Sequence, residues 1–288
     1  MRRLSSGSAL AALFLPVLLS ACGNDSTRPK FVEEIVLFGY LYVGETASGA
    51  GAIRLHRTLP VDQYYDAGRA AVLNAFVTLR ADTAAVADTL PMAAPGVYAN
   101  PEVVIRERTT YHLKALIDGR TVTATTTTPR SFETPREPRE ISAGVMPQSA
   151  IADSFPIVVA CPDPEQIFLV DVYCTENWRN AHFIHRLGGG QETPQSYVEY
   201  GGADGEPRHI SAYFRLKDIQ QSSQGYLVGF YGDMMWFYGQ YQVGIFSLDE
   251  NYYNYLYRDH PELNGGVSGG IGVFGSACRK QYRVQVVE

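Results

Sequence analysis

Hydrophobic and polar residues alternate along much of the chain and predict a protein built mainly of short β-strands. Clear runs of this kind are IVLFGYLYVG at 35–44 and NAFVTLRAD at 74–82. Successive side chains of a strand point to opposite faces, so a period of two is typical of strands with one buried face. Turn signals are frequent and no long helix is predicted before residue 130. We therefore expect an N-terminal antiparallel β-sandwich, immunoglobulin- or transthyretin-like, over residues 31–129.

The strongest local signal in this region is a hairpin in TTYHLKALIDGRTVTATTTTP, residues 109–129. Two alternating runs flank Asp118-Gly119, a dipeptide that supplies positive φ at both central positions of a type I′ turn. The first run places Leu113 and Ile117 on one face, together with Ala115. The pattern predicts that this face is buried.

A charged, proline-rich stretch, RSFETPREPREISAG, follows the hairpin and predicts an interdomain linker over residues 130–150. A second β-rich domain is expected over 151–288. In its first part, residues 155–161 and 168–174 alternate, and we expect them to pair as a hairpin around Pro162–Gln166. Near the C-terminus, CRKQYRVQVV alternates as a final strand.

One short helix is predicted in the second domain, in SLDENYYNYLYRD at 247–259. Ser247 and Glu250 have the spacing of a capping box, in which each side chain accepts a hydrogen bond from a free backbone N–H. Helical spacing predicts that one face docks on the second sheet and that the next residues around the helix point away from it. The expected docking residues are Leu248, Tyr252, Tyr255 and Leu256, and the expected outward residues are Tyr253 and Tyr257.

Three cysteines, Cys161, Cys174 and Cys278, lie within the predicted domains. In the expected hairpin Cys161 and Cys174 lie at opposite ends, too far apart for a disulfide. A disulfide would therefore join Cys278 to Cys161 or to Cys174. Buried thiols are the alternative, because cysteine is a small apolar residue that is common in cores.

The stretch GGVSGGIGVFGSAC, residues 265–278, fits two catalytic motifs by composition but neither by context. A G-x-S-x-G nucleophile needs a helix after its serine and a later histidine, but strand-like sequence follows Ser268 and His260 is the last histidine. A G-x-G-x-x-G dinucleotide site also needs a helix at its glycines. We expect instead that these glycines permit positive φ and close approach of two chains.

The first residues look like a bacterial lipoprotein signal. Arg2 and Arg3 precede an apolar run that is too short to span a bilayer. The run ends in Leu-Ser-Ala-Cys, which is similar to a lipobox and implies cleavage before Cys22 and acylation of its thiol. The expected division is a signal peptide over 1–21 and a lipid-anchored tether over 22–30.

The net charge and the spacing of the histidines and cysteines limit the classes of function that the sequence supports. The formal net charge of −6 and the lack of a basic stripe make nucleic-acid binding a poor fit. The histidines and cysteines lack the spacing of a metal site, and no cofactor motif is present. Twelve of the nineteen tyrosines follow residue 196, so a contact surface is expected in the second domain. The candidate contact residues are Trp236, Tyr253 and Tyr257.

The lipobox, IVLFGYLYVG, VTLRAD, the 109–129 hairpin and NGGVSGGIGVFGS together resemble an uncharacterised family of Gram-negative outer-membrane lipoproteins, domain of unknown function 4249. Members often accompany TonB-dependent receptors, which implies an outer-membrane lipoprotein with a non-catalytic binding or accessory role. The family supplies no catalytic residues to carry over. Two alternatives are a glycan-acting hydrolase and a structural envelope protein. The carboxylates of such a hydrolase are not identified by the sequence, since nothing selects acids such as Asp171 and Asp233 over surface acids.

Overall fold

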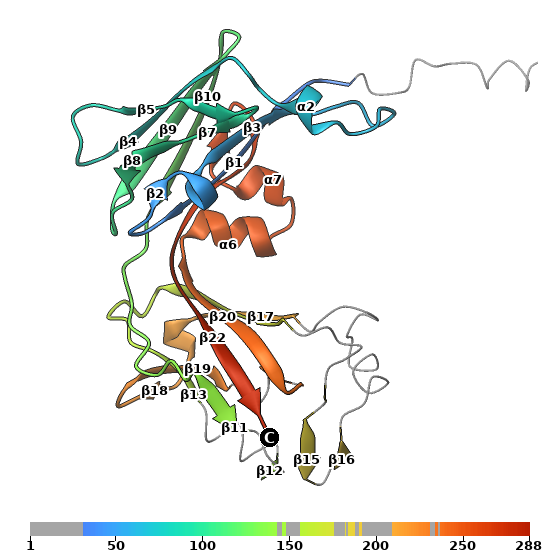
Figure 1. Cartoon of the computed structure of the whole chain (residues 1–288). Helices are drawn as coiled ribbons and strands as arrows, with labels where there is room; N and C mark the ends of the chain where they lie inside the picture. The colour runs from blue at the N-terminus through green and yellow to red at the C-terminus, as the bar shows by residue number, and fades with distance from the viewer. Residues whose placement is uncertain are drawn as a thin grey trace, which may run out of the picture.

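A computed structural model describes residues 31–142, 146–147, 156–175, 182, 184–187, 190–191, 209–230, 234–235 and 237–288. The fold is mostly β, as the alternation predicted, and contains several antiparallel and mixed sheets. Figure 1 shows two lobes, with the start of the described chain in the upper lobe and the C-terminus in the lower. The predicted signal peptide and tether with Cys22, and the candidate residues Trp236 and Asp233, lie outside the described residues.

The largest sheet extends through both lobes. Its strands lie in the order β17 (His209–Arg215), β14 (Ile167–Cys174), β20 (Gly239–Leu248), β22 (Ile271–Val287), β1 (Ile35–Tyr42), β3 (Ile53–Arg57), β7 (Val97–Tyr98) and β6 (Met92–Ala94), and β11 (Glu140–Ser142) also pairs with β22. All neighbouring pairs are antiparallel except β1 with β22 and β11 with β22, which are parallel.

A second sheet shares a core with the N-terminal part of the first, while the predicted β-sandwich itself stays a prediction. Its order is β21 (Val267–Ser268), β10 (Arg120–Thr127), β9 (Thr110–Ile117), β4 (Ala75–Ala81) and β5 (Asp88–Leu90). Leu37 and Leu55 from the large sheet share one core with Leu113 and Val122 from this sheet. The immunoglobulin- or transthyretin-like arrangement stays a prediction.

The predicted hairpin is confirmed. Strands β9 and β10 pair in register around Asp118-Gly119, and these two residues have φ of 48° and 80°. Leu113, Ala115 and Ile117 are all buried on one face. Local turn chemistry and alternation were enough to define this unit because both are encoded in adjacent residues.

The remaining elements are short. They are β2 (Thr46–Ala47), η3 (Gly49–Gly51), α2 (Ala67–Ala70), β8 (Asn100–Val104), β12 (Met146–Pro147), β13 (Pro156–Val159), β15 (His185–Leu187), β16 (Gly190–Gln191), η4 (Leu216–Asp218), β18 (Gln221–Ser222), β19 (Gly225–Phe230), α6 (Glu250–Tyr257) and α7 (Pro261–Asn264). Within 237–288, where every residue is described, α7 follows α6, so a second short helix forms inside the segment that was expected only to end the helix. No helix of the described residues is long and apolar enough to cross a membrane.

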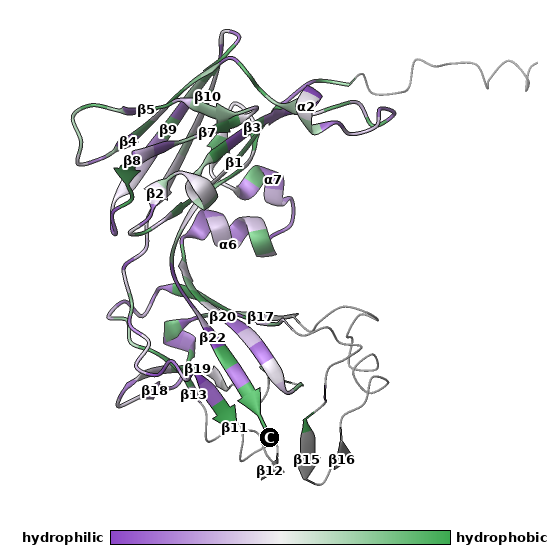
Figure 2. Ribbon diagram, viewed as in Figure 1, coloured by the Kyte–Doolittle hydropathy of each residue, from purple (hydrophilic) through white to green (hydrophobic). Residues whose placement is uncertain are grey.

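Strand β22 belongs to both cores. Its first part, Ile271–Ala277, runs parallel to β1, and its second part pairs antiparallel with β20. Phe274 is buried in the N-terminal core, whereas Val284 is buried in the core of the other lobe. Figure 2 shows hydrophobic and hydrophilic residues alternating along the C-terminal half of the strand. The boundaries 31–129 and 151–288 stay predictions, but the last strand links the two lobes.

The glycine-rich stretch has the backbone role that the sequence predicted. Gly272 has a φ of 118°, and a Cβ at this position would lie 2.1 Å from the carbonyl oxygen of Leu37. Gly269 has a φ of 78° and lies close to β10, because a Cβ there would lie 2.5 Å from the carbonyl oxygen of Thr121. The stretch therefore passes between the two N-terminal sheets at a separation that only glycine allows.

The segment predicted as a linker is held against the second lobe. Phe132 and Ile141 are buried in its core. The backbone of Glu133 exchanges hydrogen bonds of 2.9 and 2.8 Å with that of Ala160. The proline and charged residues of this segment are typical of a linker. Its two buried apolar residues, Phe132 and Ile141, nevertheless attach it to the core of the second lobe.

The hairpin predicted across 155–174 is wrong. Strand β13 pairs with β19, and β14 pairs with β17 and β20. Alternation identified both strands. It could not show that each strand pairs with partners far away in the sequence and not with the other. No disulfide joins the three cysteines that the structure describes, and their side chains are all buried, the arrangement that the thiol alternative expects.

Candidate functional site

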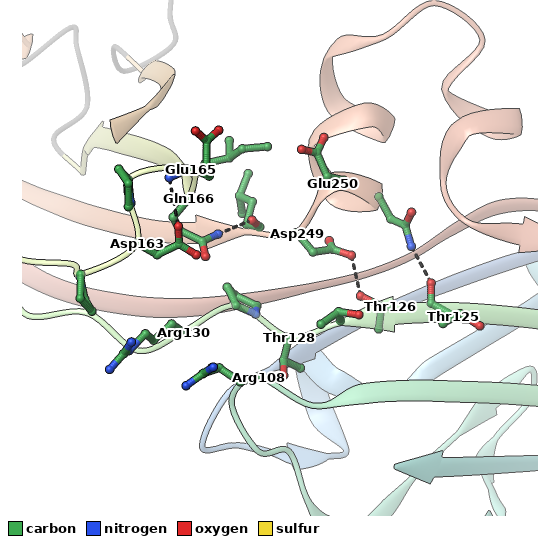
Figure 3. A pocket seen from close by; sticks show the side chains of 17 residues that line it. Arg108, Thr125, Thr126, Thr128, Arg130, Asp163, Glu165, Gln166, Asp249 and Glu250 are labelled. Carbon is green, nitrogen blue, oxygen red and sulfur yellow. Dashed lines mark hydrogen bonds between the residues drawn. The ribbon is translucent and has the colours of Figure 1, made fainter. Parts of the chain in front are cut away.

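A cavity with a volume of about 770 Å³ lies where the two lobes meet. Three segments and Arg108 line it, and the segments are the end of β10 with the residues that follow, 125–130; the loop 162–167; and the junction of β20 with α6, 248–251. Figure 3 shows polar side chains from all three segments around this space. The cavity depends on the β10 end and on α6 being held together.

Asp249 holds the end of β10 to the start of α6. Its carboxylate accepts hydrogen bonds from Thr126 Oγ1 at 2.6 Å, from the Ser276 backbone N–H at 2.9 Å and from the Tyr252 backbone N–H at 2.9 Å. The hydroxyls of Thr126 and Ser276 are also within 2.8 Å of each other. We call Asp249, Thr126 and Ser276 the Asp249 network. It connects β10, β22 and the first turn of α6.

The helix therefore begins differently from the sequence prediction. Asp249 is the N-cap of α6, because its side chain accepts from Tyr252 N. Ser247 is buried within β20, which continues to Leu248 opposite Ala277. The capping box of Ser247 with Glu250 is wrong because the strand extends two residues further than expected.

Burial raises the pKa of Asp249 to about 6, while the hydrogen bonds from Thr126, Ser276 and Tyr252 oppose this shift. The residue retains some accessible surface, but its carboxylate oxygens face donors on three elements. Desolvation of the charged form is the larger effect. This carboxyl can therefore gain a proton in mildly acidic solution, at the point where the lobes meet.

This gives a prediction for the pH dependence of stability. An acid whose pKa is higher in the folded state stabilises the fold below its unfolded pKa, and this contribution is lost as pH rises through the folded pKa. From pH 4 to pH 7, the free energy of unfolding of the protein should fall relative to that of Asp249→Asn by roughly 2–3 kcal/mol. Urea denaturation of both proteins across this range measures the difference.

Glu250→Gln is the matched control, because Glu250 is adjacent but exposed. It should show no comparable change relative to the protein between pH 4 and pH 7. A constant difference between the protein and Asp249→Asn over the same range would contradict the raised pKa.

The other acids of the cavity already have partners. Glu250 forms an ion pair with Arg215 at 2.7 Å, and Glu165 forms one with Lys217 at 2.7 Å. Asp163 accepts a hydrogen bond from the Glu165 backbone N–H at 3.0 Å. Each carboxylate thus stabilises a local structure, so none of them is left as an obvious general acid or base.

Two arginines give the cavity a cationic side. Arg108 and Arg130 lie across the space from Asp163 and Glu165 (Figure 3). Neither guanidinium forms an ion pair within the part of the chain that the structure describes. The described part of the chain also contains no group of three or more His, Cys, Asp or Glu side chains that could hold a metal ion. The arrangement suits a polar ligand with charges of both signs.

A second candidate site is aromatic. Tyr213 of β17 contacts Tyr257 and Tyr253 of α6, with ring centroids 3.8 and 5.3 Å apart. Tyr213 is 46% exposed and Tyr257 is 37% exposed. We call these three residues the tyrosine surface. Sequence reasoning missed Tyr213, because nothing local indicates that β17 lies beside the helix.

The predicted faces of the helix need correction. Tyr252 packs on Tyr40 at 4.5 Å and Tyr255 packs on Phe38 at 6.0 Å between ring centroids, and Tyr252 also lies against Gly275. This face therefore docks on β22 of the second region, as predicted, and in addition on β1. Leu256, expected to be buried, is exposed. Tyr253 and Tyr257 do not simply point outward, because strand β17 supports them. The helix lies between two strands, so opposite faces are both partly covered.

The resemblance found in the sequence is confirmed for the family. Residues 30–283 match the family described as Domain of unknown function (DUF4249). No curated protein matches the sequence. The match includes both lobes, the cavity and the tyrosine surface, and the chain therefore belongs to the DUF4249 family.

Proposed function

We propose that this protein is an outer-membrane lipoprotein, anchored through Cys22, that acts as a non-catalytic binding or accessory subunit of a TonB-dependent receptor. The observation that supports an accessory role is the tyrosine surface. Tyr213 and Tyr257 remain substantially exposed while they stack on each other. Tyrosine combines a large apolar ring with a hydroxyl and is enriched in protein interfaces.

The tyrosine surface is also pre-organised. Tyr253 packs on both Tyr213 and Tyr257, with centroids 5.3 and 5.5 Å apart, and Asp249 fixes the start of the helix. Rings that are already ordered lose little conformational entropy when a partner covers them. This favours a contact surface over rings that merely fill a gap.

The alternative of a glycan-acting hydrolase has weaker support. Hydrolysis of a glycosidic bond needs one carboxyl as an acid and a second as a base or nucleophile. Asp249 has a suitable pKa, but three donors occupy its oxygens. Glu165 and Glu250 are held in ion pairs with Lys217 and Arg215. We therefore assign the cavity to binding.

The accessory role is tested by removing the exposed rings. Tyr213→Ser combined with Tyr257→Ser should reduce co-purification with the receptor at least tenfold, because central aromatic contacts contribute most to interface affinity. The measurement is the amount of TonB-dependent receptor recovered with the tagged protein from detergent-solubilised outer membranes. Stability should fall only modestly, since both side chains are partly exposed.

Phe76→Ser combined with Leu116→Ser provides a matched control. These two exposed apolar residues pair across β4 and β9, away from the tyrosine surface. Receptor recovery should be unchanged in this variant. Equal recovery with the tyrosine variant and the parent protein, both folded, would remove the tyrosine surface as the receptor contact.

A further inference from the structure

A loop between β3 and α2 exposes apolar and aromatic residues at its tip. Tyr64 is 94% exposed, Tyr65 is 62% exposed and Val61 is fully exposed. Single exposed apolar residues are common on protein surfaces, but three within five residues form a patch. No described residue covers these side chains, so their exposure needs a different explanation from packing.

The loop is ordered at its base. The Gln63 backbone N–H donates to the Pro60 carbonyl at 3.0 Å. Asp66 caps α2 by accepting from the Arg69 backbone N–H at 2.9 Å, and Arg69 donates from its side chain to Gln63 Oε1 at 2.9 Å. The local hydrogen bonds thus hold the loop in a form that presents Tyr64 and Tyr65 outward.

The described chain begins beside this loop. Thr58 and Glu34 exchange two hydrogen bonds, each of 2.9 Å, one of them to the Thr58 hydroxyl. Phe31 and Val32, which precede Glu34, are also exposed. Figure 1 shows the start of the described chain and the loop before α2 on the same side of the upper lobe. Two apolar segments therefore lie on one side of the upper lobe.

Chain length places this side of the lobe near a bilayer if Cys22 carries lipid. Cys22 precedes Phe31 by nine residues, and a fully extended chain covers about 3.3–3.6 Å per residue. Phe31 can therefore lie at most about 32 Å from the anchor, and the loop lies beside it. This step rests on the proposed function, because it requires the acylated Cys22.

The charged residues near this loop do not favour binding to an anionic lipid surface. Three acidic residues near the loop offset its cationic side chains: Glu33, Glu34 and Asp62. Arg57 is already paired with Glu33 and Asp118. Attraction to a bilayer must then come from the apolar residues and from tyrosine, which is enriched at the interface between headgroups and acyl chains. A zwitterionic lipid surface satisfies these requirements.

We propose that Val61, Tyr64 and Tyr65, together with Phe31 and Val32, form a membrane-contacting patch that inserts into the lipid headgroup region beside the anchor. The patch orients the molecule on the bilayer. The C-terminus lies in the other lobe, and α6 lies between the lobes (Figure 1). The tyrosine surface on α6 and β17 is separate from the patch and would remain available to a receptor.

Fluorescence quenching by brominated phosphatidylcholine tests this contact in the full acylated protein. The variant Tyr64→Trp places an indole in the patch, and Phe76→Trp places one at a site of comparable exposure, 58%, on β4. Both variants retain the chain's own Trp178 and Trp236, so the signal is the difference from the parent protein. In vesicles, Tyr64→Trp should be quenched at least twice as strongly as Phe76→Trp.

The outcomes separate the two proposals. If the proteins float with the vesicles but Tyr64→Trp is quenched no more than Phe76→Trp, the membrane contact is wrong and the anchor is retained. If the parent protein does not float with vesicles, the anchoring proposal fails and the membrane contact fails with it. Protection of Tyr64→Trp only in the presence of the receptor would identify a protein contact and would also overturn the proposal.

Discussion

Replacing Gly272 with alanine should destabilise the protein by about 3–5 kcal/mol, a large fraction of the stability of a typical domain. The new Cβ would lie 2.1 Å from the Leu37 carbonyl oxygen, and the φ of 118° is unfavourable for any residue with a side chain. Leu37 cannot withdraw, because it is buried in β1 and pairs with Leu55 of β3 on its other side. Urea denaturation monitored by circular dichroism measures the loss.

Gly44→Ala separates the two causes of this effect. Gly44 also has a positive φ, 81°, but no atom lies within 4 Å of a Cβ built there. This control should lose only about 1–2 kcal/mol, the cost of the backbone conformation alone. If both variants lost the same amount, the close approach of β22 to β1 would not be what requires glycine at position 272.

The same junction shows which parts of the fold the sequence could predict. Alternation identified β1, β4, β9 and β10, and Asp118-Gly119 identified the turn between the last two, because these signals lie within short segments. The final strand was also expected. Its sequence could not show that the first part of β22 pairs with β1, since that partner lies more than 200 residues away in the chain. Strand partners depend on the complete core and not on the local pattern.

The candidate site shows the same difference between local and distant signals. Asp249 lies next to the predicted helix, but its role depends on Thr126 and Ser276, which come from other strands. Tyr253 and Tyr257 were identified from helical spacing, whereas Tyr213, which supports them, was not. A helical pattern indicates which residues share a face. It does not show that strands lie on both sides of the helix.

Replacing Cys22 with serine should remove the protein from the outer-membrane fraction almost completely. The lipobox implies that the Cys22 thiol carries a diacylglycerol and that its new N-terminus is also acylated, and serine cannot be modified in this way. Three acyl chains exceed the roughly two signals needed for stable anchoring. The patch at Val61, Tyr64 and Tyr65 buries far less apolar surface than these chains and should not retain the protein alone.

Cys161→Ser is the matched control, because it makes the same substitution at a buried thiol and leaves the lipobox intact. This variant should remain with the membranes and incorporate labelled fatty acid, while Cys22→Ser should do neither. Fractionation after a high-salt wash, together with fatty-acid labelling, measures both properties. If Cys22→Ser still sedimented with outer membranes after that wash, anchoring would not depend on Cys22, and the accessory role would have to rest on protein contacts alone.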